Sequence, residues 1–172
     1  MNVLKTMGNL LPYHLLSYGA LLGAEVYQSF VNTKICYQAL PMREFITLNK
    51  RIFPVYFGCQ VGLAALTAAT RPPFSIVSLV QDVWSVVPLG VVLVMGSLNW
   101  FIYGPRTTTA SLVRRSLHEN KKNSADPDEG KVHQANRGFA VNHAMSIHVN
   151  AIALVATVWY GFSLSASILN GF

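Results

Sequence analysis

Glu25 is the only acidic residue within the apolar stretches of this sequence, and its chemistry there needs an explanation. A carboxylate inside a membrane-spanning helix costs a few kcal/mol unless it is protonated or paired. One interpretation is structural, with an ion pair or a hydrogen bond to a neighbouring helix. The other is functional, with Glu25 as a titratable or cation-binding group in a vestibule that opens to the cytosol.

Other polar residues recur at helical spacing around Glu25. In a helix, at about 100° per residue, one face of the first apolar stretch carries five of them: His14, Ser17, Tyr18, Glu25 and Gln28. The last apolar stretch has a matching row: His143, Ser146, Asn150, Thr157 and Ser165. Asn99 and Gln60 add amides to the two stretches between them. We expect the two rows to face each other inside a bundle with a polar interior.

Five histidines raise the question of a haem or metal site between helices. His14 and His143 fall at opposite ends of the expected helices, and His143 and His148 project from different faces of one helix. Two His and Ser pairs have helical spacing, but no acid or oxyanion donor accompanies either. We therefore expect no catalytic residue, no cofactor, no bound metal and no enzyme activity. A haem- or metal-binding bundle is the lesser alternative.

Four apolar stretches must position these residues, and each is long enough to cross a bilayer. The chain is 52% hydrophobic and only 12% charged, against roughly 25% charged residues in soluble domains. The sequence therefore predicts an all-α, polytopic membrane protein, a single domain over residues 1–172 with a four-transmembrane-helix bundle. The expected helices cover residues 10–32, 52–69, 83–103 and 140–162. The polar segment 104–139 has little apolar surface and is predicted to be a flexible cytosolic loop.

The net charge of +6 fits membrane insertion better than nucleic-acid binding. Eleven of the thirteen Lys and Arg residues lie in the two segments that follow the first and third stretches. The positive-inside rule places these segments in the cytosol and both termini on the other side. The bilayer is thus the expected partner, with no nucleic acid. A secretory-pathway or plasma membrane is the favoured location, and a mitochondrial membrane is the alternative.

Glycines at four-residue spacing predict how the first two helices pack. Gly19 and Gly23 lie in the first stretch, and Gly58 and Gly62 lie in the second. Such pairs let helix backbones approach closely. We expect antiparallel neighbours that meet through these glycine faces.

Three blocks of residues resemble the transmembrane protein 205-like family, and the similarity runs along most of the chain. The first block is Phe30-Val31, Leu40-Pro41, Phe45, Lys50-Arg51, Phe53-Pro54 and Tyr56-Phe57. The second is Asn99 with Pro105-Arg106-Thr107-Thr108, and the third is Phe139, His143, Ser146 and Asn150. The resemblance implies a small four-helix membrane protein of poorly defined biochemical function, with a reported link to metal-drug tolerance.

This sequence departs from the family pattern at two positions. The family usually has an acidic residue where Gly104 stands here, and often an amide where Glu25 stands. Charge could thus have moved between sites, so Glu25 would supply the countercharge for Arg106.

The three blocks converge at the cytosolic ends of the expected helices and define a candidate polar cluster or partner-binding surface. Its residues are Glu25, Gln28, Asn99, Arg106, Thr107, Thr108, His143, Ser146 and Asn150. The favoured function is a structural or adaptor component, or an accessory subunit of a larger membrane complex. The alternative is a small carrier or conduit, which requires a homo-oligomer or an internal cavity, with a polar path centred on Glu25.

Overall fold

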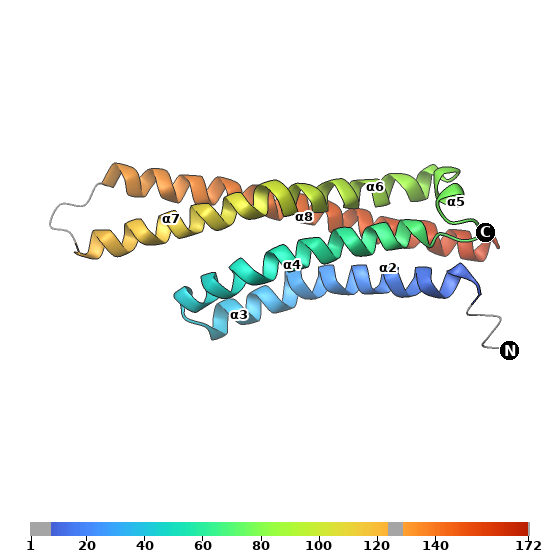
Figure 1. Cartoon of the computed structure of the whole chain (residues 1–172), viewed down its shortest axis with the longest axis horizontal. Coiled ribbons are helices and arrows are strands. Elements are labelled where there is room, and N and C mark those ends of the chain that lie inside the picture. Colours follow the sequence, from blue (N-terminus) through green and yellow to red (C-terminus); the bar gives the residue numbers. More distant parts are fainter. Residues whose placement is uncertain (1–7, 124–128, 172) are drawn as a thin grey trace.

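The computed structural model describes residues 8–123 and 129–171, and their regular secondary structure is helical throughout (Figure 1). No β-strand occurs within these residues, so the all-α prediction is confirmed. Two short segments are π-helices, in which the backbone winds more widely than in an α-helix. The elements are α2 (Leu10–Val26), η1 (Tyr27–Asn32), α3 (Thr33–Ala39), α4 (Met42–Ala69), α5 (Ile76–Val80), α6 (Val83–Leu98), η2 (Asn99–Tyr103), α7 (Gly104–Asn123) and α8 (Glu129–Leu169).

Three helices in the described part of the chain are long and apolar enough to cross a membrane. They are Met42–Ala69, Glu129–Leu169 and the continuous helix Val83–Glu119, which joins α6 to α7 through η2. The first predicted span corresponds to α2 and η1, and α2 alone has 17 residues. The length and composition of these helices thus indicate a helical membrane protein.

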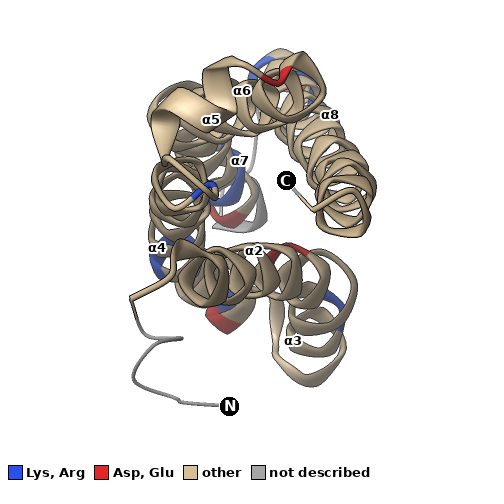
Figure 2. Ribbon diagram, turned by 90° about the vertical axis from the view of Figure 1, so that its right-hand side faces the viewer, with Lys and Arg blue, Asp and Glu red and all other residues tan. Residues whose placement is uncertain are grey.

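The helices α2, α4, α6 and α8 surround a common axis (Figure 2). Each packs on the next in this order, and α8 closes the ring against α2. One apolar cluster takes one buried residue from each helix: Leu21, Ala64, Val92 and Ala156. A second cluster, nearer the chain termini, holds Leu79, Leu89, Tyr160 and Leu164. These two clusters fix the register of the bundle.

Side-chain caps begin two of the helices. Asn9 accepts a hydrogen bond from Leu11 N at 2.9 Å, and Asp82 accepts one from Trp84 N at 3.1 Å. Each cap satisfies a backbone N–H that has no partner within the first turn. Helix α4 begins at Met42, ten residues before the expected start at residue 52. Pro54 therefore lies inside this helix rather than in its first turn.

The flexible loop predicted over 104–139 is wrong for most of its length. Helix α7 runs to Asn123 and α8 starts at Glu129, while residues 124–128 lie outside the described residues. The two helices support each other: His118 Nε2 lies 3.2 Å from Asn136 Oδ1, and the Arg114 guanidinium lies 5.0 Å from the Phe139 ring centre. Because α7 and α8 supply contacts for each other, this polar segment can form stable helices.

The predicted glycine contact between α2 and α4 is also wrong, although the two helices are neighbours. A Cβ added at Gly19, Gly23 or Gly62 would meet no other atom within 4 Å. Gly58 instead faces η2, where its Cβ would lie 3.2 Å from Cζ2 of Trp100. The exposed glycines thus lie away from the contact, where Gln60 bonds to Glu25 and Thr67 bonds to Ser17.

Candidate functional site

The carboxyl group of Glu25 lies in the centre of the bundle and is fully buried. Its Oε1 accepts a hydrogen bond of 2.7 Å from Nε2 of Gln60 on α4. Thr157 of α8 lies next to the same carboxyl group. The other oxygen, Oε2, has no hydrogen-bond partner in the described part of the chain. We call Glu25, Gln60 and Thr157 the central layer, because they join α2, α4 and α8 in the interior.

Arg106 does not neutralise Glu25, so the predicted countercharge is wrong. Arg106 is exposed on α7, whereas the carboxyl group of Glu25 is fully buried against a neutral amide. Ion pairs join Arg71 to Asp82 and Arg115 to Glu119, and neither pair includes Glu25 or Arg106. The partner of the Glu25 carboxyl group is the amide of Gln60 on the adjacent helix, not the guanidinium of Arg106.

Three of the predicted cluster residues come together beside the central layer. The amide of Asn99, fully buried at the start of η2, donates to the backbone oxygen of Ser146 at 3.1 Å. One turn further along α8, Asn150 donates to Ser29 Oγ at 3.0 Å and accepts from the Tyr56 hydroxyl at 2.9 Å. These bonds tie α8 to η1, α4 and η2.

The other cluster residues lie elsewhere. Gln28 bonds within its own helix, where its Oε1 accepts from Asn32 Nδ2 at 2.9 Å. His143 is exposed and stacks on Phe139, with ring centres 5.2 Å apart. Arg106 is exposed, and Thr107 and Thr108 are half-buried on α7. The nine predicted residues therefore do not form one site.

The two polar rows meet at Glu25 and Thr157, whereas the other bonds between these helices join a row member to a residue outside the rows. Besides the bond from Asn150 to Ser29, His14 Nε2 lies 2.7 Å from the hydroxyl of Tyr160. Ser17 points instead to α4, where the Thr67 hydroxyl donates to it at 3.1 Å. The sequence did not predict this role of Tyr160, because an aromatic residue in an apolar helix is expected to contribute only its ring to the core.

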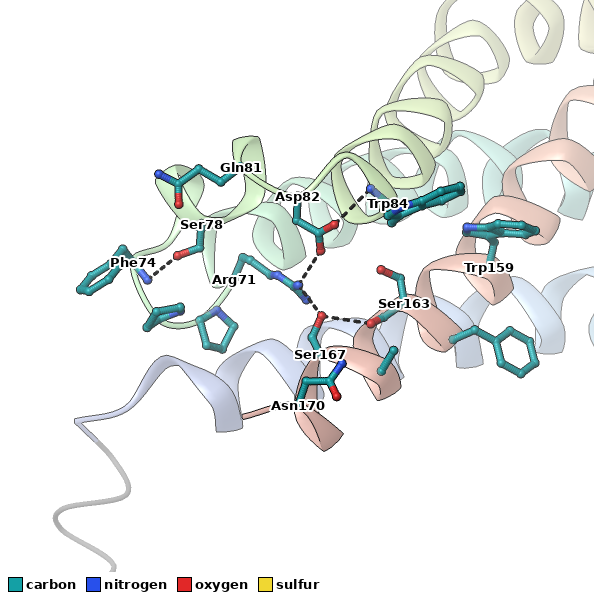
Figure 3. Close-up of a pocket in the computed structure, with 14 residues that line it drawn as sticks. Arg71, Phe74, Ser78, Gln81, Asp82, Trp84, Trp159, Ser163, Ser167 and Asn170 are labelled. Atoms are coloured by element: carbon teal, nitrogen blue, oxygen red, sulfur yellow. Dashed lines mark hydrogen bonds and ion pairs between the residues drawn. The ribbon is translucent and has the colours of Figure 1, made fainter. Parts of the chain in front are cut away.

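A second polar region, which the sequence analysis did not predict, lies at the end of the bundle where the chain termini are (Figure 3). Arg71 is buried, and its Nη2 donates to Asp82 Oδ2 at 2.9 Å and to Ser167 Oγ at 2.8 Å. The Ser85 hydroxyl donates to the same Asp82 oxygen at 2.6 Å. Beside this ion pair is a cavity of about 660 Å³.

We call this ion pair and its cavity the terminal pocket. Its lining residues come from the connection between α4 and α6, from the first turn of α6 and from the last turns of α8. Its aromatic members include Trp84, Trp159 and Phe162. One sequence signal could have found it. Arg71 and Asp82 are opposite charges in one short connection between two apolar stretches.

Both regions place hydrogen-bonding groups among apolar side chains. Among the described residues, no group of three or more His, Cys, Asp or Glu side chains could hold a metal ion. The central layer supplies one carboxyl group with a free acceptor oxygen. The terminal pocket supplies a cavity with hydrogen-bonding and aromatic walls.

Apolar helices tied together by buried polar pairs define a membrane-associated helical protein. Residues 16–116 match a family described as a domain of unknown function, DUF4149, and the chain belongs to this family. The chain is also 60% identical over 169 residues to the Xanthocillin biosynthesis cluster protein D of Aspergillus fumigatus, covering 98% of this chain and 97% of that protein. No solved structure matches the chain.

Proposed function

We propose that this chain is a four-span membrane protein that acts as an adaptor or accessory subunit for the enzymes of a biosynthesis cluster. Three spans are long and apolar by themselves. For the fourth, α2 with 17 residues and η1 with 6 form a helical segment of 23 residues, against about 20 needed to cross a bilayer. The transmembrane protein 205-like resemblance, which implies four helices, agrees with this count.

The observation that carries the proposal is a helical arm formed by residues 104–123 of α7 and 129–139 of α8. In Figure 1 this arm extends past α3 and the start of α4. It carries seven basic residues: Arg106, Arg114, Arg115, Lys121, Lys122, Lys131 and Arg137. Leu112 and Val113 are exposed on it. An ordered basic arm with exposed apolar side chains suits docking to an acidic protein surface.

The relative supports the choice of partner. It is named for a biosynthesis cluster, and it is similar to this chain over nearly the whole of both. We infer that this chain also serves a cluster, that the arm faces the cytosol under the positive-inside rule, and that its partner is an enzyme of that cluster. A secretory-pathway or plasma membrane fits this arrangement, and a tag at the C-terminus should then be inaccessible from the cytosol.

Native mass spectrometry of the particle extracted in mild detergent tests the adaptor role. We expect a stoichiometric cluster enzyme bound to the wild-type chain, and its loss from the double variant Arg106→Glu/Arg137→Glu, which reverses two exposed charges on the arm. The matched control is Lys34→Glu/Lys50→Glu, which reverses two exposed charges in the other basic segment. A wild-type particle without any foreign chain would overturn the proposal.

A carrier is the second candidate, and the unpartnered Oε2 of Glu25 favours it. In a carrier, this oxygen would bind the transported cation or proton. Glu25→Gln keeps an oxygen that can accept from Gln60 but removes the titratable group. Export of the cluster product should then fail in Glu25→Gln, whereas export in Glu25→Gln with failure in Glu25→Leu alone would indicate a structural role.

A further inference from the structure

The terminal pocket is a cavity that neither the adaptor role nor the carrier role uses. Its volume of about 660 Å³ falls within the range of about 300–1,000 Å³ of small-molecule sites. Figure 3 shows the Arg71–Asp82 pair between two groups of side chains, with Trp84 and Trp159 on one side and Ser78 and Gln81 on the other. The pocket thus has an aromatic side at Trp84 and Trp159 and a mixed side, where Phe74 accompanies Ser78 and Gln81.

The charges of the pocket neutralise each other. Among the described residues that line it, Arg71 and Asp82 carry charge, and their side chains are 2.9 Å apart. An anionic ligand would have to compete with Asp82 for the guanidinium, and a cationic ligand would have to compete with Arg71 for the carboxylate. Either ligand would also lose its hydration on entry. The pocket therefore favours a ligand without net charge.

Asp82 can still accept a hydrogen bond from a ligand. Its carboxylate already accepts from Arg71 Nη2, Ser85 Oγ and Trp84 N. A carboxylate has about four acceptor positions, and the Asp82 side chain is 30% exposed. One acceptor position is thus available for a donor such as a hydroxyl group.

The aromatic side of the pocket can hold the apolar body of the same ligand. The rings of Trp84 and Trp159 stack with centroids 6.3 Å apart, and both residues are more than half exposed. Tryptophans collect at the membrane interface, because their rings are apolar but carry an N–H that can be hydrated. An amphiphile bound at the same depth would have the same division into an apolar and a hydrated part. A ligand could therefore enter from the bilayer surface with its head toward the ion pair.

We propose that the terminal pocket binds an uncharged amphiphile with a hydroxyl-bearing head and an aromatic or acyl body. The hydroxyl donates to Asp82, and the body lies against Trp84 and Trp159. A free small molecule and a neutral lipid such as a monoacylglycerol share this chemistry. The proposal is independent of the α7–α8 arm and of Glu25, so it can fail while either of those roles stands.

Brominated probes test the proposal, because bromine quenches tryptophan fluorescence on contact. The chain has three tryptophans, and Trp100→Phe leaves only the two in the pocket to report. The purified variant in detergent at pH 7 is titrated with 4-bromophenol, 4-bromobenzoate, bromobenzene and a monoacylglycerol with a dibrominated acyl chain. We expect saturable quenching by a hydroxyl-bearing probe, with at least about tenfold tighter binding than for 4-bromobenzoate or bromobenzene.

A blocking variant separates the pocket from general uptake into the micelle. Ala166 lines the pocket and is exposed, so Ala166→Phe should fill the cavity and abolish saturable quenching. Ala144→Phe makes the same change at an exposed position of α8 that does not line the pocket and should bind like the parent. Binding of the bromophenol alone identifies a free small molecule, and binding of the monoacylglycerol identifies a lipid. Unsaturable quenching, equal quenching by all probes or full binding by Ala166→Phe would overturn the proposal.

Discussion

The central layer and the terminal pocket both bury an ionisable group, but they surround it differently. Glu25 is fully buried, and the partner of its carboxyl group is the neutral amide of Gln60. Arg71 is also buried, yet its partner is an opposite charge that is 30% exposed beside a cavity. The middle of the bundle therefore suits helix packing, whereas its end has room for a ligand.

The largest expected effect comes from breaking the ion pair of the terminal pocket. Arg71→Ala leaves Asp82 without its cation and removes the bond to Ser167. Loss of one partner of a buried pair typically costs about 3–5 kcal/mol, and the partial exposure of Asp82 favours the lower end of that range. Thermal unfolding in detergent should show a drop of about 3 kcal/mol.

A surface ion pair provides the control for this variant. Arg115 and Glu119 are also 2.9 Å apart, but they lie one turn apart on the same helix, and their side chains are 24% and 61% exposed. Arg115→Ala should cost only about 0.3–0.5 kcal/mol. Equal losses for the two arginine variants would mean that burial of Arg71 does not set the strength of its ion pair.

The next largest loss of stability is expected from breaking the hydrogen bond of the central layer. Glu25→Leu removes the acceptor for Gln60, whose amide then stays buried without that bond. An unsatisfied buried donor costs about 1–3 kcal/mol. Glu25→Gln should lose less stability, because the carbonyl oxygen of the new side chain can accept the same hydrogen bond from Gln60. A Glu25→Leu variant as stable as Glu25→Gln in detergent would contradict a packing role for this bond.

A single hydroxyl tests a polar contact beside the central layer, between α4 and α8. Tyr56→Phe removes the 2.9 Å bond to Asn150 but keeps the buried ring. The expected loss is about 1 kcal/mol, as for other neutral hydrogen bonds. Tyr27, which is 58% exposed, offers the matched control Tyr27→Phe, for which thermal unfolding should change little.

The sequence predicted the helical class, because helical periodicity records which residues share a face. Of the expected contacts between the polar rows, the structure brings Glu25 to Thr157, whereas His14 and Asn150 bond to residues outside the rows. It did not predict which polar residues would pair. Gln60 was placed near the middle of its helix, but its bond to Glu25 depends on how α4 rotates against α2. The bonds of Tyr160 to His14 and of Thr67 to Ser17 were not predicted for the same reason, since both hydroxyls lie among apolar residues in the sequence.

The segment 104–139 and the terminal pocket escaped prediction for a different reason. Composition describes a single segment, whereas the order of α7 depends on its contacts with α8, such as that of Arg114 with Phe139. The pocket likewise joins Asp82 to Ser163 and Ser167, about eighty residues away in the chain. Pairings over such distances are set by tertiary packing, which spacing within one stretch does not record.

The smallest expected effect is at Gly23, on the same helix as Glu25 but on its exposed face. The glycine spacing predicted a tight helix contact there, and Gly23→Leu would then be severely destabilising. The structure places nothing within 4 Å of a Cβ at this position, so the leucine side chain should extend outward into detergent or lipid. Thermal unfolding should change by less than about 0.5 kcal/mol, as for other surface substitutions. A loss as large as that of Glu25→Leu would place another helix, from this chain or a second copy, against this face.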